Sequence, residues 1–170
     1  YVELRKHEEA IQNFKQALNI KPDSVEAHFG LGVAYLNIGN AQEALEAFKQ
    51  TIRLKPDYAD AHFYLGTAYL KLEKIQEALD SFKQTVRLNP QDADAYYQMG
   101  MVYKTLTKTS EAIESLKQAV KVRPNFAEAH YSLGLLYLES GDRGAALDEY
   151  KMLKDLDPNM AEKLFKAIYP

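Results

Sequence analysis

Three histidines, His28, His62 and His130, are the side chains whose type and regular spacing could do chemistry in this chain. A shared metal site would bring their ring nitrogens to within about 2.1 Å of one ion. If each histidine lies on its own helix, helix packing alone separates neighbouring helix axes by about 8–10 Å. The spacing therefore argues against a metal centre and indicates instead that the chain repeats itself.

Two other patterns begin like catalytic motifs but are incomplete. His7-Glu8-Glu9-Ala10-Ile11 starts like a zinc-protease motif and lacks the second histidine. Gly30-Leu31-Gly32 opens a phosphate-binding pattern, but Tyr35 replaces its third glycine and no strand precedes it. There is no cysteine, and no pair of nucleophile and base is apparent. We therefore expect no enzymatic activity and no cofactor.

The composition is typical of a globular domain and narrows the classes of partner. Of 170 residues, 46% are hydrophobic and 26% are charged. No stretch approaches the roughly 18 apolar residues of a membrane helix, so any membrane contact would be peripheral. The net charge of −3 argues against nucleic acid, whose binding depends on many lysine and arginine contacts to phosphates. We expect a protein or peptide partner and favour a cytoplasmic location.

A 34-residue period organises almost the whole chain. Five prolines stand 34 residues apart, and the residues between them repeat in type: glycine is eighth, tyrosine eleventh, alanine twentieth, and a large apolar residue twenty-fourth in each block. The predicted units are the second helix of a truncated repeat at 1–24, complete repeats at 25–58, 59–92, 93–126 and 127–160, and a capping helix at 161–170. The defining prolines are Pro22, Pro56, Pro90, Pro124 and Pro158.

Each complete block is predicted to form two helices, at about 25–38 and 42–54 in the first block. Both segments place apolar residues at the 3.6-residue spacing of a helix. The recurring glycine lies inside the first helix, where it costs about 0.5–1 kcal/mol relative to alanine. We expect this cost to be offset because Gly32 faces the small Ala44 on the second helix, which lets the two helices approach closely.

The order Leu31-Gly32, Tyr35, Ala44, Phe48 and Pro56, repeated at the same spacing, resembles the tetratricopeptide repeat (TPR). The chain has no Trp, and the fourth place of each block, where this family often carries one, holds His28, His62, Tyr96 or His130. The resemblance implies an all-α fold, a right-handed superhelical solenoid of antiparallel helix pairs. It also implies a concave groove lined by the first helices and a role in binding or scaffolding.

The resemblance assigns a second apolar face of the first helices to this groove. The alternative is that these residues pack on neighbouring repeats. The predicted groove residues are Phe29, Val33, Leu36, Phe63, Thr67, Leu70, Tyr97, Met101, Tyr131, Leu135, Leu138 and Phe165.

Two rows of charge accompany the apolar faces. The acidic row forms the predicted groove edge and comprises Glu26, Asp60, Asp94 and Glu128, continued by Glu162. It would recognise a basic ligand or, as we favour, complement the dipoles of the helices that it begins. The basic row comprises Lys15, Lys49, Lys83, Lys117 and Lys151, and we expect the last four to form i,i+3 ion pairs on a solvated face.

Two functions remain open at this stage. The first is a peptide- or protein-binding adaptor that uses the aromatic groove residues. The second, which the resemblance also implies, is a self-assembling structural scaffold that organises a larger complex or a bacterial organelle or envelope assembly. Members of the family that clamp chaperone C-termini use lysine and arginine on the inner face, and the corresponding places here hold none. The chain begins in mid-repeat, so we expect the natural protein to extend N-terminally and this piece to self-associate through Phe14.

Overall fold

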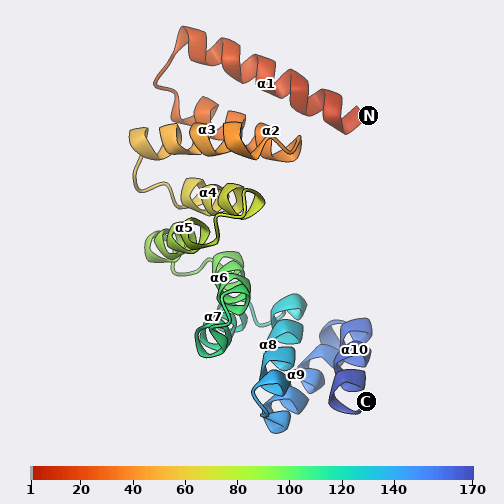
Figure 1. Ribbon diagram of the computed structural model, residues 1–170. Coiled ribbons are helices and arrows are strands. Elements are labelled where there is room, and N and C mark those ends of the chain that lie inside the picture. Colours follow the sequence, from red (N-terminus) through yellow and green to blue (C-terminus); the bar gives the residue numbers. More distant parts are fainter. Residues whose placement is uncertain (1) are drawn as a thin grey trace. The chain divides into compact units, whose positions relative to one another are not determined.

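The computed structural model describes residues 2–170 and the side chains of residues 5–170. This part of the chain consists of ten α-helices and contains no strand, which confirms the predicted all-α class (Figure 1). In chain order they are α1 (Val2–Ile20), α2 (Val25–Asn37), α3 (Ala41–Leu54), α4 (Ala59–Lys71), α5 (Ile75–Leu88), α6 (Ala93–Thr105), α7 (Thr109–Val122), α8 (Ala127–Glu139), α9 (Arg143–Leu156) and α10 (Pro158–Ile168).

The helices begin and end where local chemistry requires it. Ser24 and Asp92 accept hydrogen bonds from the backbone N–H three residues later, which caps α2 and α6. The turn between the two helices of a repeat needs a left-handed residue, and Gly39 and Gly141 supply it with φ near 85°. In the two middle repeats Glu73 and Thr107 adopt the same left-handed conformation without being glycine.

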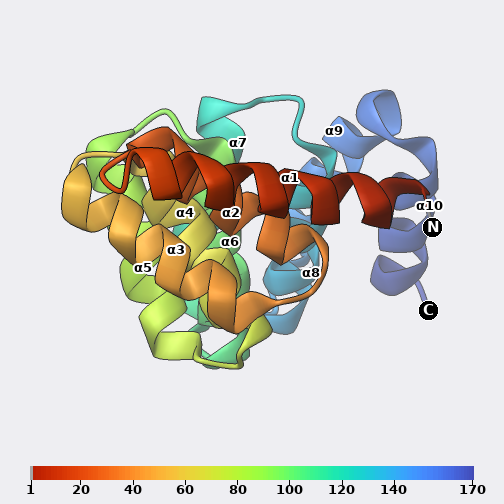
Figure 2. The ribbon, with the colours of Figure 1, turned by 90° about the horizontal axis from the view of Figure 1, so that it is seen from above.

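The described residues up to Pro90 form one compact unit that contains α1 to α5. Consecutive helices of this unit lie side by side in both views (Figures 1 and 2). Its core joins α2, α3 and α4 through Leu36, Phe48 and Leu65. A second cluster, with Ile11, Leu31 and Ala47, attaches α1 to α2 and α3.

The recurring glycine makes room for a ring, which corrects the expected contact between glycine and alanine. A Cβ atom on Gly32 would lie 2.6 Å from the ring of Phe48, and one on Gly66 would lie 2.8 Å from the ring of Phe82. Both rings are fully buried. In these two repeats the glycine therefore seats the large residue at the twenty-fourth place of the block, and the alanine at the twentieth place is also buried.

Residues 91–170 form the second unit, with α6 to α10. Its cores place Leu116 of α7 against Leu133 and Leu136 of α8, and Ala146 and Leu153 of α9 against α10. Both views show α8, α9 and α10 together at the blue end of the chain (Figures 1 and 2). α10 begins at Pro158, ahead of the predicted block boundary.

Candidate functional site

Phe29, on the predicted groove face of α2, is the centre of an aromatic cluster. Its ring centroid lies 5.0 Å from that of Tyr58, 5.6 Å from that of Tyr64 and 5.8 Å from that of Phe48. These distances are typical of attractive ring pairs. Phe29 is half-buried, so it joins one repeat to the next with part of its surface and leaves the rest accessible. The ring of Phe29 therefore fits both explanations of this face: it packs on the neighbouring repeat, and it keeps accessible surface on the predicted groove side.

A hollow of about 340 Å³ lies next to Phe29, between α1 and α2. Its lining is mostly apolar and includes Phe14, Phe29 and Val33, with His7 and Asn37 contributing polar groups. Gly30 in its lining has no side chain, and a Cβ there would lie 2.3 Å from the ring of Phe14. One repeat later the corresponding place holds Tyr64, whose ring stacks on Phe48 at 5.8 Å. The hollow is large enough for a ligand side chain.

On α4 the remaining predicted groove residues of the first unit, Phe63, Thr67 and Leu70, are all half-buried. Phe63 contacts the ring of Phe82 at 5.6 Å, and Thr67 donates a hydrogen bond to the carbonyl of Phe63. Leu36 differs from the others, since only 8% of it is exposed and it packs in the core. Leu36 therefore packs beneath the groove face and contributes almost no accessible surface to it.

The second unit carries its own set of predicted groove residues. Half-buried members on α6 and α8 are Tyr97, Met101, Tyr131, Leu135 and Leu138. Phe165 on α10 is 42% exposed and stacks between Tyr150 and Tyr169 at 5.3 and 4.9 Å. A hollow of about 250 Å³ lies beside it, lined by Tyr150, Lys154, Pro158, Ala161, Glu162 and Phe165.

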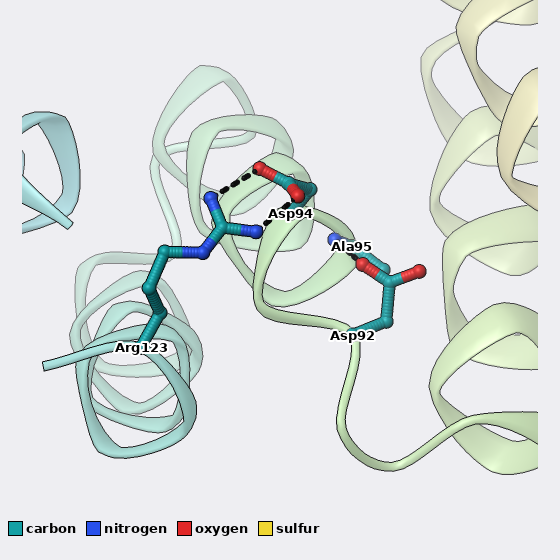
Figure 3. Close-up of polar contacts among 4 residues, drawn as sticks. All are labelled: Asp92, Asp94, Ala95 and Arg123. Atoms are coloured by element: carbon teal, nitrogen blue, oxygen red, sulfur yellow. Dashed lines mark hydrogen bonds and ion pairs between the residues drawn. The ribbon is translucent and has the colours of Figure 1, made fainter. Parts of the chain in front are cut away.

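The acidic edge residues differ in their contacts. Figure 3 shows Arg123, the residue that follows α7, with its two terminal nitrogens directed at the two carboxylate oxygens of Asp94. One of these hydrogen bonds measures 3.0 Å. This carboxylate raises the pKa of Arg123 further above its ordinary value. Hydrogen bonds from the backbone and from Ser24 lower the pKa of Glu26. Glu162 pairs with Lys166, whereas Asp60 and Glu128 are exposed at helix starts.

Three of the four i,i+3 ion pairs expected of the basic row are found on the second helices. Lys49 lies 3.4 Å from Glu46, Lys117 lies 3.9 Å from Glu114, and Lys151 lies 2.7 Å from Asp148. Their side chains are about half exposed or more, so each pair stabilises its helix by only a few tenths of a kcal/mol. The row is a solvated face.

The three histidines have a structural role that their spacing alone does not indicate. In each case Nε2 lies 2.9 Å from the carbonyl oxygen of the proline six residues earlier, at Pro22, Pro56 or Pro124. Because a carbonyl only accepts, Nε2 must carry a proton. The histidine thus fixes the turn that leads into its own helix. His130 also has a second partner, Glu149, at 2.6 Å.

Sequence reasoning missed two ring residues, Tyr58 and Phe126, that end their blocks. Their ring centroids lie 5.0 Å from those of Phe29 and Tyr97, with the ring planes tilted by 37° and 42°. Lys55 lies over the ring of Tyr58 and Arg123 over that of Phe126, at 5.1 and 4.5 Å from the centroids. The sequence feature that could have indicated them is an aromatic residue two places after the repeat proline, which two of the blocks contain.

Neither a metal centre nor a membrane span is found where the structure describes the chain. Among those residues, no group of three or more histidine, aspartate or glutamate side chains could hold a metal ion. Within the same part of the chain, no helix combines the length and the apolar character needed to cross a membrane.

Comparison with known proteins identifies the family. A model described as "TPR repeat" matches residues 1–39 and 108–141, and models described as "Tetratricopeptide repeat" match 35–93, 81–114 and 127–160. No curated protein sequence matches significantly.

Several solved structures are similar over most of their length. A MamA crystal structure is 32% identical, covers 89% of each chain and has a TM-score of 0.83. YrrB, described as a TPR protein with an unusual peptide-binding site, is 26% identical over 97% of this chain and 86% of its own, with a TM-score of 0.79. TTC0263, a TPR protein from Thermus thermophilus, is 28% identical over 99% of this chain and 94% of its own, with a TM-score of 0.71. The chain described here belongs to the tetratricopeptide repeat family.

Proposed function

We propose that this chain is a non-catalytic adaptor that binds a peptide or protein segment on the groove faces of its first helices. Family membership and the similarity to TPR proteins support the broader role of a protein-interaction module. The hollow between α1 and α2, with Phe14, Phe29 and Val33 in its lining, is the observation that carries the narrower proposal.

The chemistry of this hollow suits an apolar side chain of a ligand. Aromatic residues dominate binding hot spots because they bury much area with few rotatable bonds. The half-buried ring of Phe29 is already held by three neighbouring rings, so a ligand would not have to order it. YrrB, a structural neighbour, is described as having a peptide-binding site, which agrees with this role.

Peptides selected from a displayed random library against the whole chain provide the test. Binding of a selected peptide should fall at least tenfold in Val33→Glu, because a carboxylate would be placed in the apolar lining. Lys49→Glu, on the exposed side of α3, is the matched control and should leave affinity unchanged. Equal affinities for wild type and a folded Val33→Glu variant would contradict the proposal.

A second role, self-assembly through α1, is favoured by a different observation. Ile20 is 86% exposed and Ala17 is exposed, whereas Phe14 is half-buried on Gly30. Phe48 and Phe82, which hold the corresponding place in later repeats, are fully buried. We therefore propose that the apolar residues of α1, including the originally predicted Phe14, are the contact between copies.

Light scattering on the whole chain distinguishes this second role from the first. At about 100 μM, well above micromolar dissociation constants, a self-assembling chain should be larger than a monomer. Ile20→Glu should return it to a monomer without loss of helical signal, since this side chain is exposed and supports no core. A wild-type chain that remains monomeric at this concentration would rule out self-assembly and leave the adaptor role.

A further inference from the structure

His130 on α8 differs from His28 and His62 because acceptors face both of its ring nitrogens. Nε2 lies 2.9 Å from the carbonyl oxygen of Pro124, and Nδ1 lies 2.6 Å from Oε2 of Glu149. Only 5% of His130 is exposed, and the side chain of Glu149 is 15% exposed. Water therefore cannot readily replace either contact.

This geometry requires one proton between His130 and Glu149. The carbonyl of Pro124 has no hydrogen, so Nε2 must donate. A neutral ring would then direct the lone pair of Nδ1 at an ionised carboxylate, which is repulsive. A proton between Nδ1 and Oε2 converts this repulsion into a charge-assisted hydrogen bond. The hydrogen bond to Glu149 raises the pKa of His130 above its ordinary value near 6.5, although burial opposes this change.

The first and second complete repeats contain the equivalent histidine without the carboxylate partner. Ala47 takes the place of Glu149 beside His28, and a hollow of about 440 Å³ remains there. Beside His62 the place is taken by Ser81, with a hollow of about 280 Å³. In both repeats the contact from Nε2 to the proline carbonyl persists at 2.9 Å. The turn contact therefore does not need the second partner.

We propose that the His130–Glu149 pair is a pH-sensitive contact that holds α8, α9 and the turn at Pro124 together while it retains its proton and loosens them as the pH rises. Glu149 is the charged group that faces His130 from α9. From α10, the apolar side chain of Leu164 packs against Gly134, one turn along α8 from His130.

Other titratable groups near α8 act on Tyr137. Burial raises the pKa of Tyr137, and the charges of Glu149, Asp142 in the following turn and Glu114 of α7 add to this effect. On His130 itself, the charge that favours the protonated ring is that of Glu149.

The sign of the pH dependence follows from the raised pKa of His130. A group whose pKa is higher in the folded state binds its proton more tightly there, so the contribution to stability is complete below about pH 6.5. The contribution is lost as the pH rises through the folded-state pKa. Each unit of difference changes the equilibrium between closed and open forms about tenfold.

Nitrogen-15 NMR of the imidazole rings in the whole chain, between pH 5 and 9, tests the proton directly. His130 should carry N–H on both ring nitrogens and should keep the second proton to a higher pH in wild type than in Glu149→Gln. If Nδ1 of His130 has no proton at pH 6 in wild type, the proposal is wrong. The measurement at pH 6 needs only the wild-type chain, so it can contradict the proposal even if Glu149→Gln does not fold.

Amide hydrogen exchange tests the consequence for α9. After correction for the intrinsic effect of pH, α9 opening in wild type should increase between pH 6 and 9, by about tenfold for each unit by which NMR finds the pKa of His130 raised. Glu149→Gln should show no such increase. Ala47→Glu, which places a carboxylate in the hollow beside His28, should make His28 keep its second ring proton to a higher pH. Identical pH dependence of α9 opening in wild type and Glu149→Gln would overturn the proposal.

Discussion

In the first complete repeat, residues 25–58, the ring of Phe48 lies over Gly32, whereas Leu164 of the following helix lies over Gly134 of the fourth repeat, residues 127–160. Tyr150 holds the place of Phe48 in that repeat and stacks on Phe165 of α10 instead. α10 follows Asp157 without an intervening turn and packs in one cluster with α8 and α9. The same glycine thus has a different partner because the next helix begins earlier.

The largest effect is expected from Gly32→Leu, with Gly134→Leu as its counterpart. A side chain at residue 32 would meet the ring of Phe48, which is fully buried and has Phe29 and Tyr64 as ring neighbours. We expect a loss of about 3 kcal/mol in the free energy of unfolding. At residue 134 the nearest atoms are terminal methyl groups of Leu164, which can rotate, so a loss of about 1–2 kcal/mol is expected.

Urea unfolding followed by circular dichroism measures both losses. Helical content of each variant before denaturation serves as the control for correct folding. Equal losses, or a larger loss for Gly134→Leu, would show that the rigidity of the opposing side chain does not determine the cost.

The fold could be predicted from the sequence because it depends on local, repeated signals. Proline, glycine and apolar spacing define α2 and α3 almost to the residue, since helix ends are set by neighbours in the chain. The ring that lies over Gly32 and the burial of Leu36 could not be predicted. Both depend on contacts between helices, which periodicity alone leaves undetermined.

The candidate site was predictable only as a face. The spacing placed Phe29 and Val33 on one side of α2, but it did not indicate the hollow. The hollow also needs Phe14 of α1, whose ring lies against Gly30, at the place that holds Tyr64 in the next repeat. Glu149 passed unnoticed because a charged residue in the second helix is normally exposed. The pairing with His130 depends on three-dimensional proximity across 19 residues.

A smaller difference in loss of stability is expected between Phe29→Ala and Tyr131→Ala. These substitutions change the residue at the fifth place of the first and fourth repeats. Phe29 contacts three rings, whereas Tyr131 has no ring neighbour in the part of the chain that the structure describes. We expect losses of about 3 and 1.5 kcal/mol, because aromatic pairs add to the burial of area. Thermal melting of both variants measures the difference, and a greater loss for Tyr131→Ala would contradict the structural role of the cluster.

The smallest effect concerns Asp157 and Lys55, which hold the same place at the ends of the two repeats. The carboxylate of Asp157 accepts hydrogen bonds from the backbone N–H groups of Asn159 and Met160 at 2.9 and 3.0 Å, and thereby starts α10 at Pro158. Loss of such a cap costs about 1 kcal/mol, so Asp157→Ala should lower stability by that amount.

Lys55→Ala, which removes an exposed cation lying over Tyr58, should cost about 0.5 kcal/mol or less. Hydrogen exchange locates the effect of each change. In Asp157→Ala the first turn of α10 should lose protection before α9 does, because the missing cap frees the N-terminal N–H groups of α10 alone. Unchanged exchange in α10 would mean that Pro158 and the packing of Leu164 on Gly134 are sufficient to begin this helix. The early start of α10 would then be a property of its apolar face, and the contrast between the two repeats would depend on Leu164 instead of Asp157.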